Sequence, residues 1–181
     1  LICAYNYANK NFDENIKISY EFKGFIVYYY QKEQKNFEIG DIINKVLIKE
    51  TNEVVDLAEP EKLANAINNI KIGDTIYFLR GNKELSYVLD ENLSSSNLNR
   101  FAAYAKFAID EEKTFPKYNL YSANTLGPSG GLLQTLSVYS QITGIDLTKG
   151  KKICGTGTIS VGGTVGRIGG ISQKIVTAIR N

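Results

Sequence analysis

Histidine, methionine and tryptophan are all absent from this chain of 181 residues. Without histidine, a Ser-His-Asp triad, a Cys-His dyad and any histidine-containing metal site are excluded. The two cysteines, Cys3 and Cys154, cannot build a structural zinc site by themselves. They can form one disulfide, although nothing in the sequence requires it. We therefore expect no metal and no cofactor, and an enzyme of this composition must take its base from Lys, Asp, Glu or Tyr.

Long apolar runs and a strong charge imbalance are also missing. No run of about 18 apolar residues occurs, so the sequence predicts no membrane span. The net charge of +2 gives no electrostatic case for a nucleic-acid partner. With 43% hydrophobic and 22% charged residues, the composition is that of a globular protein with one ordinary domain or two small ones. Because the chain begins at Leu1 and not at Met, we expect it to be a fragment or a processed form.

The N-terminal residues are polar and then give way to a β-like pattern. Residues 1–15 are rich in asparagine and are interpreted as a lead-in segment with a mobile end. Alternating apolar residues predict a strand over 16–22. Gly24 then interrupts the pattern, and the apolar run over 25–30 predicts a second, more buried strand.

Two Gly-Asp pairs divide the following region. Gly40-Asp41 is predicted to be a tight turn that feeds a short strand, and Gly73-Asp74 opens another strand. A helix is expected to start at Pro60 between them, because proline is accepted in the first helical turn and apolar residues follow at helical spacing. Gly81-Asn82 is predicted to be the turn of a β-hairpin.

This order of elements resembles a PDZ domain of the kind associated with bacterial proteases. The resemblance covers about residues 16–90 and rests on three stretches and their spacing: Gly24-Phe25-Ile26-Val27, Ile39-Gly40-Asp41-Ile42-Ile43, and Ile72-Gly73-Asp74-Thr75-Ile76 followed by Arg80-Gly81. It implies a small β-barrel domain that binds an extended peptide as an added strand. The residues in the place of the family's peptide-binding loop are Gly24, Phe25, Ile26 and Val27. Residues 47–57 do not follow the family pattern.

A second domain is predicted to follow a polar linker over 91–99, which contains three consecutive serines. Alternating apolar residues favour a strand over 101–109, although the alanines within it also suit a helix. A charged turn over 110–113 and a short strand over 118–121 are expected next. The second domain would thus span residues 100–181.

A glycine-rich turn, Leu-Gly-Pro-Ser-Gly-Gly at 126–131, stands directly before a predicted helix over 132–142, which ends at Gly144. Ser129 in this turn has two interpretations. As a helix N-cap, its hydroxyl would accept a hydrogen bond from the first helical turn. As a nucleophile, it would use the glycines for close approach of a substrate carbonyl and the helix N-terminus to stabilise an oxyanion.

A serine nucleophile needs a base, and in the absence of histidine a lysine is the leading candidate. An amine accepts a proton only where its charged form is disfavoured, for example by burial among apolar groups. Lys174 follows Gly169-Gly170 in a predicted helix over 171–179 and has apolar neighbours. The alternative interpretation is a solvated lysine on a helix surface, which is the usual state of this residue type.

The stretch from Gly155 to Gly170 is dense in glycine and follows a predicted strand over 152–154. It can be interpreted as a phosphate cradle, or as a set of hairpin turns and bulges. Its spacing lacks the third glycine of a dinucleotide fingerprint, and the chain contains no P-loop. We therefore expect no nucleotide partner.

Ser129 and Lys174 lie 174 − 129 = 45 residues apart, and Gly155-Thr156-Gly157 stands between them. In this order and spacing the stretches closely resemble the proteolytic domain of Lon-type serine proteases, over about residues 118–179. With the PDZ-like region ahead of it, the chain resembles the PDZ-containing, membrane-anchored Lon-like proteases of Gram-positive bacteria. The expected fold class is α+β, with a small PDZ-like β-barrel domain followed by a Lon-type protease domain.

The resemblance implies a role for each residue of the motif. Ser129 would be the nucleophile and Lys174 the general base and later acid, while Thr156 would hydrogen-bond the lysine amine. Backbone N–H groups near Ser129 and Gly130 would form the oxyanion hole. The implied activity is ATP-independent hydrolysis of peptide bonds through an acyl-enzyme, with the substrate presented by the PDZ-like domain. The alternative is a PDZ peptide-binding scaffold fused to an inactive or incomplete protease fold.

The resemblance also carries expectations about completeness and cellular placement. The family's protease domain continues past the lysine helix, so we expect the chain to be truncated at its C-terminal end. The relatives are anchored outside the cell membrane by an N-terminal helix, so that face of the membrane is expected, with the cytoplasm as the alternative. The expected partner is a peptide or protein substrate in extended form, without nucleic acid, and assembly into a homo-oligomer stays open.

Overall fold

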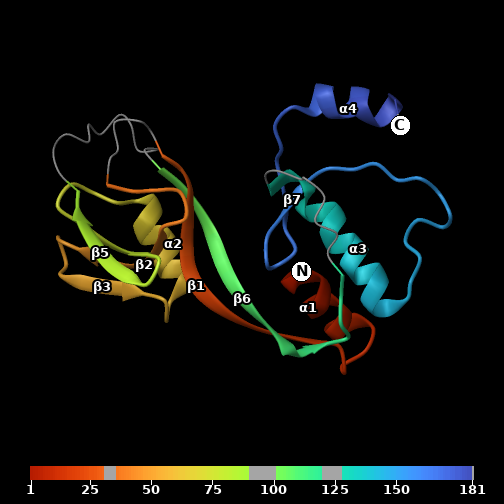
Figure 1. Cartoon of the computed structure of the whole chain (residues 1–181), viewed down its shortest axis with the longest axis horizontal. Helices are drawn as coiled ribbons and strands as arrows, with labels where there is room; N and C mark the ends of the chain where they lie inside the picture. Colours follow the sequence, from red (N-terminus) through yellow and green to blue (C-terminus); the bar gives the residue numbers. More distant parts are fainter. Residues whose placement is uncertain (31–35, 90–100, 120–127, 181) are drawn as a thin grey trace. The chain divides into compact units, whose positions relative to one another are not determined.

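A computed structural model describes residues 1–30, 36–89, 101–119 and 128–180 (Figure 1). Over these residues the chain is an α+β protein with four helices, one six-stranded antiparallel sheet and a small two-stranded hairpin. It divides into two compact units, unit 1 with residues 1–19 and 109–181 and unit 2 with residues 20–108. These boundaries differ from the predicted ones at two places: residues 1–19 belong with the C-terminal part of the chain, and residues 101–108 belong to unit 2 and not to the predicted domain over 100–181. The predicted linker over 91–99 lies outside the described residues.

The large sheet has the strand order β5-β4-β2-β1-β6, with β3 paired to β2 beside this path. Its strands are β1 (Lys17–Tyr30), β2 (Ile42–Ile48), β3 (Glu53–Asp56), β4 (Thr75–Arg80), β5 (Lys83–Val88) and β6 (Phe101–Phe115). β5 and β6 stand at the two ends of the order, so the predicted closed barrel is not found among the described strands. Because β1 and β6 each cross a unit boundary, both strands belong partly to unit 1 and partly to unit 2.

β1 is one continuous strand, whereas two strands separated by Gly24 were expected. Gly24 lies inside it with a φ of +113°, and the pairing of β1 with β2 follows at once with Phe25 opposite Ile43. A Cβ atom at Gly24 would stand 2.3 Å from the carbonyl oxygen of Ile43. The glycine therefore does not end the strand; it allows the two backbones to approach closely.

β6 is also longer than predicted, because the charged residues expected to form a turn over 110–113 continue the strand. Thr114 near its end is buried, and its hydroxyl donates to the carbonyl oxygen of Asp110 at 2.7 Å, a contact within β6. The same hydroxyl accepts the N–H of Ser19 at 3.3 Å, and this bond connects the end of β6 to the beginning of β1.

Unit 2 has its core between the sheet and helix α2 (Pro60–Asn68). The helix begins at Pro60 as predicted and buries Leu63 completely against Val46 of β2 and Val55 of β3. A second group of buried side chains lies on β1, β2, β4 and the segment before β2: Val27, Phe37, Ile43, Ile76 and Phe78. The predicted hairpin of β4 and β5 is confirmed, with Arg80 opposite Lys83 at its turn.

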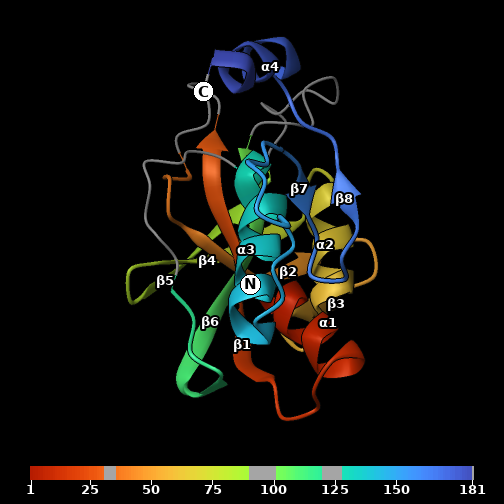
Figure 2. The same cartoon turned by 90° about the vertical axis from the view of Figure 1, so that its right-hand side faces the viewer.

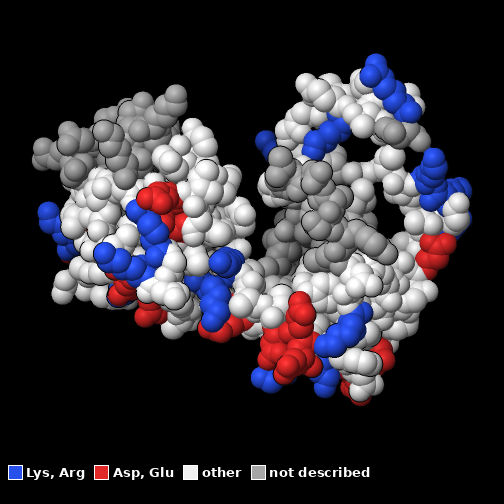
Figure 3. Space-filling view, in the orientation of Figure 1, with Lys and Arg blue, Asp and Glu red and all other residues white. Residues whose placement is uncertain are grey.

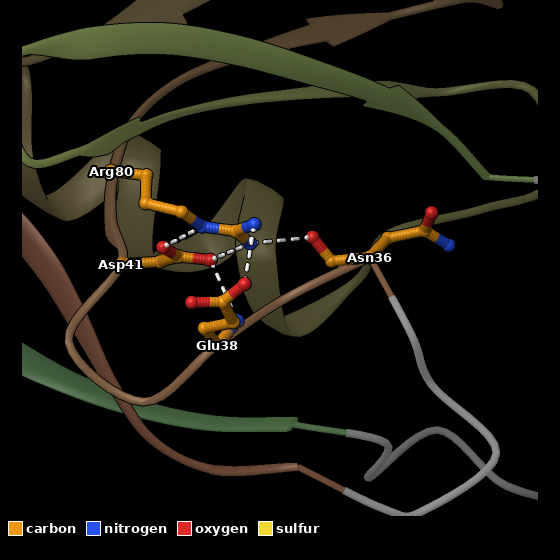
Figure 4. Close-up of polar contacts among 4 residues, drawn as sticks. All are labelled: Asn36, Glu38, Asp41 and Arg80. Atoms are coloured by element: carbon orange, nitrogen blue, oxygen red, sulfur yellow. Dashed lines mark hydrogen bonds and ion pairs between the residues drawn. The ribbon is translucent and has the colours of Figure 1, made fainter.

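Each Gly-Asp pair forms a turn directly before a strand, as predicted. Asp41 and Asp74 are 2% and 5% exposed, and each accepts the N–H of the residue three positions earlier at 2.8 Å. Asp41 also accepts two hydrogen bonds from the guanidinium of Arg80, at 2.9 and 2.8 Å. The same guanidinium contacts Glu38 at 2.7 Å and donates to the carbonyl oxygen of Asn36 at 3.0 Å (Figure 4). Arg80 of β4 therefore anchors the segment over residues 36–41, which leads into β2.

Unit 1 begins with helix α1 (Ile2–Asn11), so the predicted mobile lead-in is wrong. α1 lies beside helix α3 (Gly131–Thr143) in both cartoon views (Figures 1 and 2). Their shared core is formed by Ala4, Tyr5, Ala8, Ile16, Val138 and Ile142. The Tyr5 ring meets the edge of the Tyr118 ring at 6.0 Å, and its hydroxyl donates to the carbonyl oxygen of Pro116. The segment is ordered because its few apolar residues have a partner far along the chain.

The rest of unit 1 carries the glycine-rich region. α3 ends at Gly144 as predicted, with the left-handed φ of +71° that favours glycine. β7 (Thr158–Ile159) and β8 (Val165–Gly166) pair as a short hairpin, and helix α4 (Ile171–Arg180) follows. The predicted strand over 152–154 is not formed, and of the one predicted over 118–121 the two described residues are not in a strand. No described helix has the length and apolar character needed to cross a membrane.

Candidate active site

Ser129 lies in a 3-10 turn, Pro128–Gly130, directly before α3. The N-cap of α3 is Gly130, and no side chain caps the helix. The N-cap interpretation of Ser129 is therefore wrong. Its hydroxyl instead points to a lysine from another element of unit 1, and it is half-buried.

Lys174 comes from the first turn of α4, and its ammonium reaches two hydroxyl groups. The Nζ atom donates to Ser129 Oγ at 2.6 Å and to Thr156 Oγ1 at 3.2 Å. The Lys174 side chain is half-buried, not fully solvated. Within the described parts of the chain, no carboxylate lies within 4.0 Å of this ammonium. The polar neighbours of the amine are thus two hydroxyls, one of which is a potential nucleophile.

Thr156 and Gly157 hold the backbone of the Ser129 turn in place. The Thr156 hydroxyl donates to the carbonyl oxygen of Ser129 at 3.0 Å, and the N–H of Gly157 donates to the same oxygen at 2.8 Å. In return, the Leu132 N–H donates to the Gly157 carbonyl oxygen at 3.0 Å. Because its proton is used on Ser129, the Thr156 oxygen is left to accept from Lys174. One threonine thus orients both the serine turn and the lysine amine.

Gly157 packs closely against Leu132 of α3 and Val165 of β8. A Cβ atom at this glycine would lie 2.9 Å from Leu132 Cδ2, 3.1 Å from Leu132 Cβ and 3.3 Å from Val165 Cγ1, so a larger residue there would require these side chains to shift. The glycine-rich stretch therefore forms hairpin turns and close backbone contacts, and this is the second of the two interpretations offered for it.

A helix N-terminus and a stretch of sequence without acidic residues accompany the pair. Ser129 stands at the N-terminal end of α3, where the helix dipole presents its positive end and N–H groups. From Leu147 to the end of the chain the sequence has lysines and arginines but no aspartate or glutamate. In the view of Figure 3, the end of unit 1 that carries α4 accordingly presents blue side chains and no red ones. Negative charge that develops near Ser129 would be stabilised by these surroundings.

A pocket of about 680 Å³ opens beside the pair. Ser129, Thr156 and Lys174 line it together with mainly aliphatic side chains from three segments of unit 1: Leu133, Ile153, Ile171, Ile175 and Ala178. This volume lies in the range of ordinary ligand pockets. A serine hydroxyl, a lysine side chain and a pocket lined mainly by aliphatic side chains therefore meet at one place.

The residues predicted to bind a peptide lie elsewhere, in unit 2. Gly24, Phe25, Ile26 and Val27 are part of β1, which has β2 on one side and β6 on the other. The Tyr28 ring, just beyond them, lies 5.1 Å from the ring of Tyr104 in β6. A peptide could thus add to β1 at this place only by displacing β6. The peptide-binding role of these residues stays a prediction.

Two contributors to the site were not singled out from the sequence. Gly157 anchors the Ser129 carbonyl, but a glycine among many glycines gives no signal of such a contact. Leu133 lines the pocket one turn beyond Ser129, and its i+4 spacing was a usable signal for that position. Nothing in the described part of the chain groups three or more Cys, Asp or Glu side chains so that they could hold a metal ion.

Comparison of the chain with protein-family models, with curated proteins and with solved structures found no match. Its function has therefore to be argued from the geometry of Ser129, Thr156 and Lys174.

Proposed function

We propose that this chain is a serine peptidase of the Lon type, with a Ser129–Lys174 dyad in unit 1 and a PDZ-like unit 2. The observation that supports it most is the 2.6 Å contact between Lys174 Nζ and Ser129 Oγ in a chain without histidine. The family resemblance of the motifs around Ser129, Thr156 and Lys174 supports the same assignment. The order β1, Gly-Asp turn, β2, β3, α2, Gly-Asp turn, β4, β5 in unit 2 supports the PDZ-like part.

In the proposed reaction, the neutral Lys174 amine takes the proton of Ser129 while Oγ attacks the carbonyl carbon of a peptide bond. The negative charge on the carbonyl oxygen is stabilised by backbone N–H groups of Ser129 and Gly130 at the positive end of α3. The Lys174 ammonium then gives its proton to the leaving amine, and the acyl-enzyme forms. Water then gives a proton to the same amine and attacks the acyl carbon; the bond from that carbon to Ser129 Oγ breaks, Oγ takes the proton back from Lys174, and the acid is released. Every step uses the chain's own side chains, so the proposed activity does not need ATP.

The test is labelling of Ser129 by a fluorophosphonate, which phosphonylates an activated serine. The unaltered chain is expected to be labelled, Ser129→Ala not at all, and Lys174→Ala at least about 100-fold more slowly, because a general base contributes about 10²–10⁴-fold. Lys174→Arg is expected to be as slow as Lys174→Ala, since a guanidinium donates hydrogen bonds but does not accept the serine proton. Thr156→Val should slow labelling by misplacing the amine.

Matched controls come from the same helix and from a neighbouring loop. Ser172→Ala and Lys151→Ala remove an exposed serine and an exposed lysine and should leave the rate unchanged. Labelling that persists in Ser129→Ala would refute the nucleophile assignment. A fast Lys174→Arg variant would refute the role of lysine as base, and a chain that is not labelled at all would support an inactive scaffold.

A further inference from the structure

We infer that the pocket beside Ser129 binds an uncharged, apolar side chain of the substrate, and that Leu133 sets the size limit of that side chain. The inference rests on the proposed peptidase function and adds the substrate class. It concerns the residue whose carbonyl group Ser129 would attack, because that residue is held closest to the nucleophile.

Several apolar side chains that line the pocket are exposed to solvent. Ile153 of the segment before Thr156 is 54% exposed, and Ile171 and Ile175 of α4 are both 51% exposed. Ile171, Lys174, Ile175 and Ala178 recur at helical spacing, so the lysine and the aliphatic side chains share one side of α4. A substrate side chain that covers this surface would gain hydrophobic binding energy directly beside the dyad.

The charge of the pocket disfavours reaction of substrates with a cationic side chain and of substrates with an anionic side chain. Lys174 is the single charged residue among those that line it, so a cationic side chain would meet repulsion and find no carboxylate. An anionic side chain would pair with the Lys174 ammonium. That pairing would occupy the group that has to take the Ser129 proton, so such a substrate would bind without reacting.

Leu133 closes the pocket next to the dyad. It stands one helical turn beyond Ser129 in α3 and packs against Gly155, the residue before Thr156. A Cβ atom at Gly155 would lie 3.0 Å from Leu133 Cδ2, which is tight. The space at this end is therefore fixed by two positions that can be changed in opposite directions: Leu133→Ala would enlarge it, and Gly155→Ala would reduce it.

The experiment uses peptidyl diphenyl phosphonates that carry Ala, Val, Leu, Phe, Lys or Asp before the phosphorus atom. Ser129 Oγ would attack phosphorus, Lys174 would take the hydroxyl proton, and phenoxide would leave. We expect the Val and Leu probes to label Ser129 at least about 10-fold faster than the Lys and Asp probes. Leu133→Ala should favour Phe over Leu by about 10-fold relative to the unaltered chain, and Gly155→Ala should shift the preference towards Ala.

Leu136→Ala is the matched control, because it truncates a leucine of the same helix that does not line the pocket. It should keep the original order of probes. Leu133→Val repeats the test with a smaller change, and circular dichroism shows that each variant is folded.

The outcomes separate this inference from the proposed function. Failure of a small fluorophosphonate, which lacks a side chain, to label Ser129 would refute the peptidase proposal itself. Labelling by that reagent, with Lys or Asp probes as fast as Leu, would overturn only the substrate class. An unchanged order of probes in Leu133→Ala, Leu133→Val and Gly155→Ala would overturn the role of Leu133.

Discussion

Two buried aspartates show how single residues of this chain build its turns. Asp41 and Asp74 each follow a glycine with positive φ, at +100° and +94°, and each precedes a strand. Asp74 uses its two carboxylate oxygens for the N–H groups of Lys49 and Lys71, at 2.9 and 2.8 Å. Asp41 also stands in a turn before a strand, but its carboxylate accepts hydrogen bonds of two kinds. One comes from a backbone N–H, and two come from the guanidinium of Arg80.

This difference predicts unequal costs for the same substitution. Asp41→Asn should lower the free energy of unfolding by about 2–3 kcal/mol, because the asparagine NH₂ cannot accept and leaves donors of Arg80 or the backbone unpaired. The figure is kept low because the Arg80 side chain is 34% exposed and water can solvate it. Asp74→Asn should cost about 1–2 kcal/mol, since one lost backbone N–H acceptor is at stake. Urea denaturation of both variants measures the difference.

The control is the same change made where the guanidinium is absent. In an Arg80→Ala background, Asp41→Asn should cost distinctly less than it does alone, whereas Asp74→Asn should cost the same. Equal costs of Asp41→Asn in the two backgrounds would show that Arg80 does not depend on Asp41.

At the scale of elements, helix α1 makes stability depend on alkaline pH. Burial raises the pKa of Tyr5 to about 12 from its usual value near 10, and the neighbouring Tyr118 adds to the shift. The folded state therefore binds this proton more tightly than the unfolded state does. Its stabilising effect is complete below about pH 10 and is lost as the pH rises from about 10 to about 12. Two pKa units correspond to about 2.7 kcal/mol.

We accordingly expect the unaltered chain to lose about 2–3 kcal/mol more stability than Tyr5→Phe between about pH 10 and 12. Urea unfolding at a series of pH values measures this loss, after correction for the hydrogen bond to Pro116 that Tyr5→Phe removes at every pH. Tyr7→Phe is the matched control on the same helix, because Tyr7 is 58% exposed. A Tyr5→Phe variant with the same alkaline loss as the unaltered chain would contradict the prediction.

The elements also show which parts of the structure could be predicted from the sequence. α2, α3 and the β4–β5 hairpin were predictable because their start and stop signals are local, such as Pro60 and Gly144. α1 was missed because its apolar side is narrow and its partners, Val138 and Ile142, lie more than a hundred residues away. The continuity of β1 was missed because the approach of Ile43 to Gly24 is a contact between strands.

The same distinction applies to the candidate site. Ser129 and Lys174 could be named from motif spacing and from the absence of histidine, and the structure brings them together. The neighbours of Gly24–Val27 could not be named, because no local pattern tells that β6 returns to pair with β1. Contacts that depend on the order of strands in a sheet require the fold itself.

At the scale of the whole molecule, the hydrophobic cores are separate. The core of α1 and α3 lies in unit 1, while the two cores around α2 and the sheet lie in unit 2. In the described parts of the chain, each of these three clusters takes its buried residues from one unit alone. The proposed catalytic residues belong to unit 1 alone, so their environment should depend on that unit's core.

Core truncations in the two units should therefore have separate effects. Ile76→Ala removes a fully buried side chain from unit 2 and should cost that unit about 2–5 kcal/mol. Hydrogen exchange measured by mass spectrometry should then show lost protection in β2 and β4, with α3 unchanged. Val138→Ala should instead lower the protection of α3 and leave β2 and β4 unchanged. It should also slow the labelling of Ser129, whereas Ile76→Ala should leave the labelling rate unchanged. Loss of protection in both units after either substitution would show instead that β1 and β6, which the two units share, make the chain unfold as one.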